Sequence, residues 1–286
     1  MSSTRREFRD LLKAGAAMLL PGVANALAAR VVADIGFAAA YVTGAGIANT
    51  HLGIPDNGLV TLTELTDHVH AIRDVLPRPL MVDADTGFGN ALNMQRAIKS
   101  LERAGADAIQ IEDQVFPKRC GHFEGKEVIP AAEMVSKIKA AVDARTDSDL
   151  MIVARTDAIA VEGFNAAMDR IHAFREAGAD IGFVEAPTTP EHVATIGKLP
   201  WPQLANIVIG GKTPELPNET LRELGFAGVI YANAALQAAV LGMQRALSHL
   251  KKTGHVGDAK DLLASFTERQ RLVDIAGFHA AERKYK

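Results

Sequence analysis

Short apolar runs alternate along the chain with longer segments in which apolar residues recur every three to four positions. This alternation is typical of βα units built on a parallel sheet. The apolar runs predict strands at 17–20, 39–42, 80–82, 108–111, 151–154, 181–184, 204–208 and 228–231. The periodic segments predict helices at 24–35, 61–76, 90–104, 131–145, 164–177, 189–197, 215–224 and 233–251.

Glycines mark the expected ends of two helices. Gly105 and Gly178 each follow a periodic segment and precede an apolar run, where a helix C-cap belongs. Eight strands and eight helices without a linker favour one (β/α)8 TIM-type barrel. The alternative is a doubly wound open sheet, which would more often carry a Gly-rich phosphate loop after its first strand. Pro21 is the residue predicted to follow that strand, so the barrel fits better.

The barrel is expected to occupy residues 1–286 as a single domain, although the length alone would also suit two domains. An amphipathic helix is predicted at about 1–14, and further helices fill about 233–286. The segment at about 113–130 has no periodic pattern. Loops of this length inside a compact domain are usually lids or binding loops, so we expect it to cover an active site.

Composition narrows the choice of partners. The formal net charge of −3 provides no field for a nucleic acid or an anionic membrane. No run reaches the roughly 18 uninterrupted apolar residues of a transmembrane helix. One cysteine cannot form an internal disulfide.

The N-terminus carries a feature of exported proteins. Arg5-Arg6, followed by small residues at 26–28, resembles a twin-arginine signal with a cleavage site. However, Asp10 and Lys13 interrupt the apolar region, and cleavage there would remove the first predicted strand. We therefore expect a cytoplasmic protein.

Polar residues follow six successive predicted strands. The carboxyl ends of barrel strands form the face on which active sites lie, so these residues predict a catalytic centre. The backbone N–H groups around residues 44–46 are also suited to binding a carboxylate or oxyanion. The residues at these ends are Tyr41, Thr43, Gly44, Ala45, Asp83, Asp85, Glu112, Arg155, Glu185 and Asn206.

Three of these carboxylates are expected to converge. Asp83 and Asp85 lie two residues apart and would share one face of a strand, with Glu112 on the adjacent strand. Like charges this close repel unless a cation lies among them. Oxygen ligands alone favour Mg²⁺, with Mn²⁺ as an alternative ion. A carboxylate pair that shares a proton without metal is the other interpretation.

The aperiodic segment contains the single cysteine. Lys118, Arg119 and His122 surround Cys120 in the sequence, and such neighbours favour the reactive thiolate. A lone cysteine is more often an inert buried residue. Its polar neighbours, and Gly121 beside it, favour the reactive interpretation.

Together these residues resemble the isocitrate lyase/phosphoenolpyruvate mutase superfamily. The likeness covers about residues 8–285 and rests on Pro-Lys-Arg-Cys-Gly-His at 117–122, Asp-x-Asp-x-Gly-x-Gly at 83–89 and Arg-Thr-Asp at 155–157. The resemblance implies a barrel whose eighth helix is exchanged with a neighbouring subunit in a homotetramer. It also implies an essential Mg²⁺.

The resemblance implies roles for individual residues. Asp85 would be the nearest metal ligand, with Asp83, Glu112 and Asp56 acting through waters. A second group would hold the α-keto acid half of a small di- or tricarboxylate substrate: Tyr41, Thr43, Gly44, Ala45, Arg155, Glu185, Asn206 and Gly121. Cys120 would be the general acid, with Tyr41, Glu112, His122 and Lys118 as further catalytic candidates.

The expected activity is Mg²⁺-dependent cleavage of a carbon–carbon bond in a 2-alkylmalate-type dicarboxylate, yielding pyruvate and a carboxylate through an enolate. Phe-Glu-Gly-Lys at 123–126 is closer to 2,3-dimethylmalate lyase-like members than to methylisocitrate lyases, which tend to have Arg after the loop His. Methylisocitrate cleavage, phosphonate or oxaloacetate chemistry and a non-catalytic barrel are the alternatives. Ile209 and Ala232-Asn233 depart from the family pattern, so the exact substrate stays open.

Overall fold

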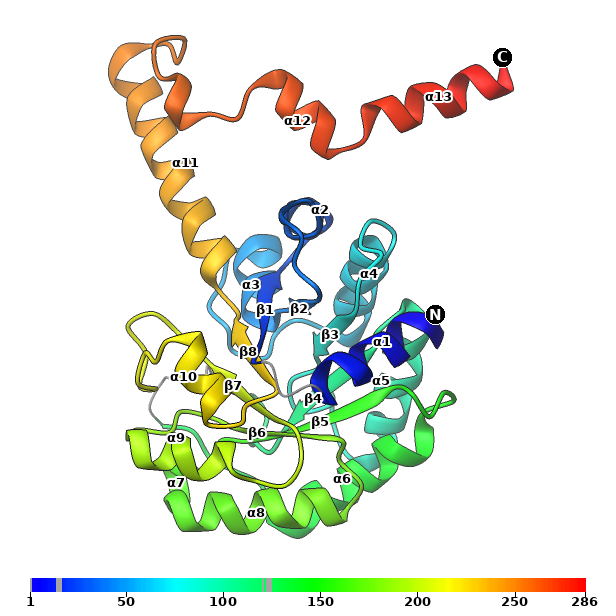
Figure 1. Ribbon diagram of the computed structural model, residues 1–286, viewed down its shortest axis with the longest axis vertical. Helices are drawn as coiled ribbons and strands as arrows, with labels where there is room; N and C mark the ends of the chain where they lie inside the picture. The colour runs from blue at the N-terminus through cyan, green and yellow to red at the C-terminus, as the bar shows by residue number, and fades with distance from the viewer. Residues whose placement is uncertain (1, 14–16, 120, 122–124) are drawn as a thin grey trace.

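A computed structural model describes residues 2–13, 17–119, 121 and 125–286, in which eight parallel strands close into a barrel in sequence order (Figure 1). The predicted (β/α)8 fold is therefore confirmed. The strands are β1 (Met18–Val23), β2 (Ala40–Val42), β3 (Leu80–Asp83), β4 (Ala108–Glu112), β5 (Met151–Thr156), β6 (Ile181–Val184), β7 (Gln203–Asn206) and β8 (Gly228–Tyr231).

The barrel closes where β1 pairs with β8, and here the sequence prediction needs a correction. Pro21 does not follow the first strand but lies within β1, opposite Tyr231. The Pro21-Gly22 pair resembles a turn in the sequence, yet Gly22 is needed for close packing. A Cβ at Gly22 would overlap the carbonyl oxygen of Ala232. Pro21 and Gly22 therefore lie where β1 packs against β8, and they do not end the strand.

Helices surround the strands, and most begin or end at the residues that the sequence predicts. They are α2 (Ala26–Ile35), α4 (Leu62–Arg73), α5 (Ala91–Ala104), α6 (Ala131–Ala144), α8 (Phe164–Glu176), α9 (Pro190–Gly197) and α10 (Asn218–Glu223). Thr61 and Glu64 form a capping box at the start of α4. Gly105 ends α5 in the left-handed conformation with a φ of 104°.

Three short helical segments were not predicted. They are α3 (Gly44–Ile47), the π-helix η1 (Ala48–Leu52) that continues it, and α7 (Ile159–Glu162). Each lies directly after a strand or shortly beyond it, and each is too short to give a periodic pattern. The Thr43 side chain caps α3 by accepting a hydrogen bond from the Gly46 N–H, which turns the chain sharply after β2.

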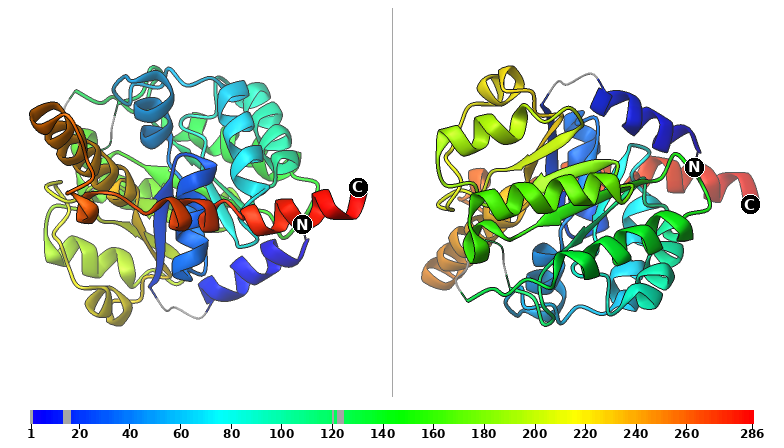
Figure 2. Two further views of the ribbon diagram at one scale, coloured as in Figure 1. Left: turned by 90° about the horizontal axis from the view of Figure 1, so that it is seen from above. Right: turned by 90° about the horizontal axis from the view of Figure 1, so that it is seen from below.

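The N-terminal helix α1 (Ser2–Lys13) covers the amino end of the barrel (Figure 2). Phe8 and Leu12 are buried against the residues that fill the barrel interior, among them Met81. Arg5 is also buried and forms ion pairs with Glu102 at 3.2 Å and with a second carboxylate, that of Asp147, at 2.9 Å. Because this end is covered, the carboxyl end of the barrel is left for a ligand.

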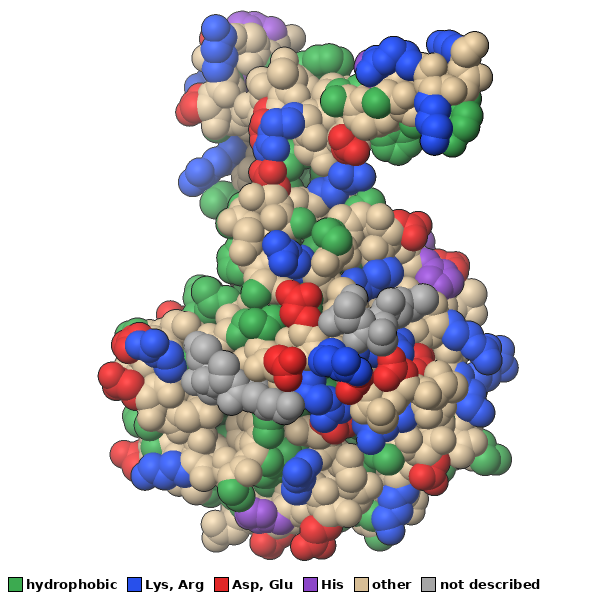
Figure 3. Space-filling view, turned by 45° about the vertical axis from the view of Figure 1, so that its right-hand side comes forward, with side chains coloured by type: hydrophobic (Ala, Val, Ile, Leu, Met, Phe, Trp, Pro, Cys, Tyr) green, Lys and Arg blue, Asp and Glu red, His purple; other side chains and the backbone are tan. Residues whose placement is uncertain are grey.

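The C-terminal helices lead away from the barrel (Figures 1 and 3). They are α11 (Ala234–Thr253), the short 3-10 helix η2 (Lys260–Leu262), α12 (Phe266–Leu272) and α13 (Ile275–Tyr285). Several of their large apolar side chains are exposed, including Phe266 at 70% and Phe278 at 64%. Along the described part of the chain, no helix is both long and apolar enough to cross a membrane.

Candidate active site

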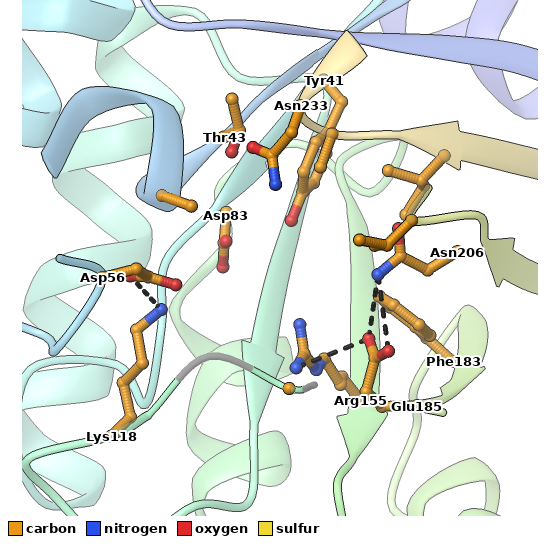
Figure 4. A pocket seen from close by; sticks show the side chains of 15 residues that line it. Tyr41, Thr43, Asp56, Asp83, Lys118, Arg155, Phe183, Glu185, Asn206 and Asn233 are labelled. Atoms are coloured by element: carbon orange, nitrogen blue, oxygen red, sulfur yellow. Dashed lines mark hydrogen bonds and ion pairs between the residues drawn. The ribbon is translucent and has the colours of Figure 1, made fainter. Parts of the chain in front are cut away.

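A pocket lies at the carboxyl end of the strands and gathers residues from most of them (Figure 4). Asp56 and Lys118 lie on one side of the pocket, and Glu185 and Asn206 lie on the other. The sequence-predicted residues that line it are Tyr41, Thr43, Ala45, Asp56, Asp83, Lys118, Gly121, Arg155, Glu185 and Asn206. Cys120 and His122, the remaining residues predicted from the loop motif, lie outside the described residues.

Asp83 and Asp85 converge, but not by the alternation of a continuous strand. Strand β3 ends at Asp83, and Asp85 adopts a left-handed backbone conformation with a φ of 48°. The N–H of Asp85 donates to Oδ1 of Asp83 at 3.2 Å. Both carboxylates reach the backbone of Gly44, where an added Cβ would lie 3.3 Å from an oxygen of each. A tight turn, rather than a shared strand face, therefore brings the two groups together.

Lys118 supplies the positive charge at this acidic side of the pocket. Its Nζ lies 2.5 Å from Oδ1 of Asp56 and 3.0 Å from Oδ1 of Asp85. Burial lowers the pKa of Lys118, but the surrounding carboxylates outweigh it and raise that pKa well above its ordinary value. Burial raises the pKa of Asp85 to about 6 although Lys118 opposes the shift. The acidic side thus holds more negative charge than one ammonium group neutralises.

Arg155 supplies the positive charge at the opposite side. Its Nε lies 2.8 Å from Asp157 and 3.3 Å from Glu112, and its Nη2 lies 3.4 Å from Glu185. Asn206 donates to Oε2 of Glu185 at 3.2 Å, so Glu185 is held between an amide and a guanidinium. This arrangement leaves the guanidinium buried, rigid and directed at the pocket, which suits a planar carboxylate ligand.

Glu112 lies between the two sides. Burial raises its pKa well above its ordinary value, even though Arg155 opposes this shift. Its Oε1 atom is buried and has no hydrogen-bond partner among the described residues. A buried carboxyl group whose pKa is strongly shifted and whose oxygen has no partner is a candidate for proton transfer.

Gln110, which the sequence pattern did not single out, links Tyr41 to Asp83. The Tyr41 hydroxyl donates to Oε1 of Gln110 at 3.2 Å, and Nε2 of Gln110 donates to Oδ1 of Asp83 at 3.0 Å. Gln110 is fully buried. The sequence spacing could have identified Gln110, because it precedes Glu112 by two residues on β4 and the two side chains therefore point to the same face of the strand. However, a glutamine inside a predicted strand can equally be a structural residue, so its position alone does not predict a role in the site.

The residues fit a hard metal ion in type, although they are not arranged as a complete chelate. Within the described residues, no three His, Cys, Asp or Glu side chains are close enough together to hold a metal. The predicted ligands Asp56, Asp83, Asp85 and Glu112 all offer oxygen atoms, and Oε1 of Glu112 is unpartnered. Mg²⁺ keeps several waters and needs only one or two direct carboxylates, so this donor set is suitable.

Comparisons with known proteins identify the family to which the chain is similar. The chain matches the model of the phosphoenolpyruvate phosphomutase family over residues 8–251. It is 41% identical to 2,3-dimethylmalate lyase of Eubacterium barkeri over 284 residues, covering 99% of this chain and 98% of that protein. It is 42% identical to 2-methylisocitrate lyase of Aeropyrum pernix over 277 residues, covering 96% of this chain and 88% of that protein.

Solved structures give the same result. A crystal structure of 2,3-dimethylmalate lyase, described as a PEP mutase/isocitrate lyase superfamily member, superposes with a TM-score of 0.93 and 34% identity. The match covers 99% of this chain and 95% of that one. Phosphonopyruvate hydrolase in complex with oxalate and Mg²⁺ superposes with a TM-score of 0.89 and 29% identity over 99% of both chains.

Gly121 gives a direct test of how closely the loop backbone approaches Arg155. A Cβ at this position would collide with the guanidinium and lie 2.8 Å from Cγ of Glu185. We expect Gly121→Ala to weaken binding of oxalate, a planar dicarboxylate that suits a guanidinium, by roughly tenfold or more. Isothermal titration calorimetry in the presence of Mg²⁺ measures this change.

Gly242→Ala is the matched control, because nothing lies within 4 Å of a Cβ added there. It should leave the affinity for oxalate unchanged. Equal oxalate affinities for Gly121→Ala and Gly242→Ala would contradict the close approach of Gly121 to Arg155.

Proposed function

The chain belongs to the phosphoenolpyruvate phosphomutase family, as its motifs predict, and we propose that it is a Mg²⁺-dependent lyase of 2-alkylmalate-type dicarboxylates. The products are pyruvate and a second carboxylate. One observation carries the proposal: Arg155 lines one side of a pocket whose other side is lined by Asp56 and Asp83, with Asp85 next to them at Lys118. A hydroxy acid that binds between them has its carboxylate at Arg155 and its oxygen atoms near the acidic side.

The charges that line the pocket favour a small dicarboxylate. Among the described lining residues, Arg155 and Lys118 are the cationic ones. Lys118 is already engaged by Asp56 and Asp85. Position 123, where methylisocitrate lyases tend to have an arginine, is Phe in this sequence. A third carboxylate would therefore lack the partner that an arginine at position 123 would supply, which disfavours a tricarboxylate.

Mg²⁺ would be held by Asp85 with Asp83, Glu112 and Asp56 in support, and it would polarise the oxygen atoms of the α-keto acid half. The chain's own groups bind that half through Arg155 and the N–H groups after β2. The Thr43 hydroxyl already caps α3, so the backbone at 44–45 is rigid. Fixed donors of this kind stabilise developing negative charge without reorganisation.

Proton transfer completes the reaction. A base removes the proton of the 2-hydroxyl, the C2–C3 electron pair moves to C3, and the leaving enolate takes a proton at C3 from Cys120. Glu112 is the first candidate for the base, because its Oε1 atom is buried and has no hydrogen-bond partner among the described residues. Tyr41 is the weaker one, since burial and the neighbouring Asp83 raise its pKa well above its ordinary value. For 2,3-dimethylmalate this scheme yields pyruvate and propanoate with all atoms accounted for.

Substrate choice is tested by measuring pyruvate release from a panel of substituted malates, methylisocitrate, oxaloacetate and phosphonopyruvate. Lactate dehydrogenase coupling reports pyruvate, and the oxaloacetate and phosphonopyruvate arms are followed by their own products. We expect the highest kcat/KM for a 2-alkylmalate and loss of turnover with EDTA, restored by Mg²⁺. Methylisocitrate as the best substrate would overturn the dicarboxylate assignment, as would preferred turnover of phosphonopyruvate or oxaloacetate.

Cys120 is tested by Cys120→Ser. If the thiol is the general acid, its loss removes a proton-transfer contribution of roughly 10²–10⁴-fold, so kcat should fall by that factor. Binding of oxalate and the melting temperature should stay close to those of the wild type. An unchanged kcat would show that another group protonates the leaving carbon.

We also propose that the chain forms a homotetramer in which the C-terminal helices are exchanged between subunits. The apolar side chains exposed on α11, α12 and α13 support this, because patches of this kind usually mark an interface. The ion pair between Arg271 and Asp34, at 2.7 Å, ties α12 to α2 within one chain. The cytoplasmic location expected from the sequence stays a prediction.

Removal of residues 255–286 tests the exchange. Light scattering should give a mass below that of four truncated chains, because the assembly dissociates; a mass equal to four truncated chains would contradict the proposal. Arg271→Ala is a milder control that removes an exposed ion pair and should keep the tetramer. A full-length chain that is monomeric at micromolar concentration would contradict the proposal.

A further inference from the structure

Lys126 forms a buried link between the loop backbone and the arginine of the pocket. Its Nζ donates to the carbonyl oxygen of Gly121 and to Oδ1 of Asp157 at 2.9 Å. The side chains of Lys126 and Asp157 are 1% and 0% exposed. Burying a lysine costs free energy unless its charge is paired. The two hydrogen bonds to Gly121 and Asp157 therefore fix where the Lys126 ammonium group lies.

Asp157 is at the same time the principal partner of Arg155. It accepts from Nε at 2.8 Å and from Nη2 at 3.1 Å, the two-point geometry that fixes a guanidinium plane. Burial raises the pKa of Asp157, but Arg155 and Lys126 outweigh it and lower that pKa to about 2. The carboxylate is therefore ionised and shared between the two cations.

Asp157 is itself rigidly held. Its backbone N–H donates to Oδ1 of Asp113 at 2.9 Å, and Oδ2 of Asp113 accepts from Thr156 at 2.7 Å and from Arg170 at 3.2 Å. All of these groups are buried. These bonds fix the backbone of Asp157, whereas its carboxylate oxygens are bonded by Lys126 and Arg155. Loss of Lys126 would therefore change how this carboxylate meets Arg155.

Gly121 completes the link on the other side. Its backbone lies so close to Arg155 and Glu185 that a Cβ would collide with both side chains. Lys126 thus bonds the carbonyl of the very residue that packs on the guanidinium, and also the carboxylate that orients it. One ammonium group therefore bonds two groups that both lie against Arg155, the Gly121 backbone and the Asp157 carboxylate.

We propose that Lys126 is a positioning residue that holds the Gly121 backbone and the Arg155 guanidinium in register for carboxylate binding. Its kinetic consequences rest on the proposed lyase function, whereas its effect on ligand binding does not. Lys126 touches neither substrate nor metal in this role. It acts through Asp157 and through the Gly121 carbonyl.

The test compares Lys126→Met, which keeps the length of the side chain but removes its charge, with Lys139→Met on the exposed face of α6. The first readout is the Kd of oxalate with Mg²⁺ by calorimetry. We expect it to rise roughly tenfold or more in Lys126→Met, since a small misplacement of a binding group costs up to about 10²-fold. It should stay unchanged in Lys139→Met.

A second readout does not depend on ligand binding or catalysis. Cys120 is the chain's single cysteine and the peptide neighbour of Gly121. Release of the Gly121 carbonyl should change the rate at which iodoacetamide alkylates that thiol, measured by mass spectrometry. A purely structural ion pair would lower the melting temperature but leave both the oxalate Kd and the alkylation rate as in the wild type, and this result would overturn the proposal.

Two further variants keep the test decisive. Lys126→Arg retains the cation, so its oxalate Kd should lie between those of the wild type and Lys126→Met. If Lys126→Arg folds but binds oxalate as weakly as Lys126→Met, the positive charge of Lys126 is not what positions Arg155. If Lys126→Met fails to fold, Lys126→Gln is read by the same two measurements with the same criteria.

The kinetic arm separates this proposal from the function on which it rests. With a cleaved malate, Lys126→Met should raise KM more than it lowers kcat, because Arg155 binds the ground state and the transition state alike. Wild-type enzyme that binds oxalate but cleaves no member of the panel would overturn the lyase assignment and leave the Lys126 test intact. Wild-type enzyme that binds no oxalate would overturn the role of Arg155 and Lys126 together.

Discussion

The pairing of Arg155 with three buried carboxylates is the interaction on which the pocket depends. Glu112, Asp157 and Glu185 come from β4, the end of β5 and the end of β6, and the sheet register places Glu112 directly opposite Arg155. A buried charge that lost its partner would cost several kcal/mol, so these groups must be present together. The barrel makes this possible because neighbouring parallel strands end at the same face. The charges in turn fix where Gly121, Asn206 and Asp113 can lie.

The opposite end of the barrel shows why only one face carries this polarity. Helix α1 places Phe8 and Leu12 against the barrel interior, and its Arg5 is neutralised by Glu102 and Asp147 outside that interior. The amino end is therefore sealed by apolar contacts, with charges confined to its rim. Water and ligands reach the interior from the carboxyl end. A ligand that enters there meets the acidic side and the arginine side at once, since both line one pocket.

Most of the barrel could be predicted from the sequence, because each buried strand is a short apolar run and each helix has its own periodicity. The end of β1 could not, since Pro21 and Gly22 are turn residues by local preference and their packing against β8 is a tertiary fact. The position of the pocket could also be predicted, because polar residues follow six successive strands in the sequence. Their partners were harder to predict: the turn at Asp85 depends on its own backbone conformation, and Gln110 and Lys126 matter only through groups distant in sequence.

The two sides of the pocket differ in how well their charge is balanced, and this difference has a chemical meaning. Around Arg155, carboxylates outnumber the cation, yet Asp157 keeps a pKa of about 2 because Arg155 and Lys126 together outweigh its burial. Around Lys118, burial wins and the pKa of Asp85 rises to about 6. The acidic side is thus short of positive charge, while on the arginine side Asp157 stays ionised and holds the guanidinium in place. A hard dication would relieve the first, and the proposed function assigns binding of a carboxylate to the second. A hydroxy dicarboxylate held between them has its oxygen atoms near the side that attracts cations, which is the polarity that loss of a hydroxyl proton requires.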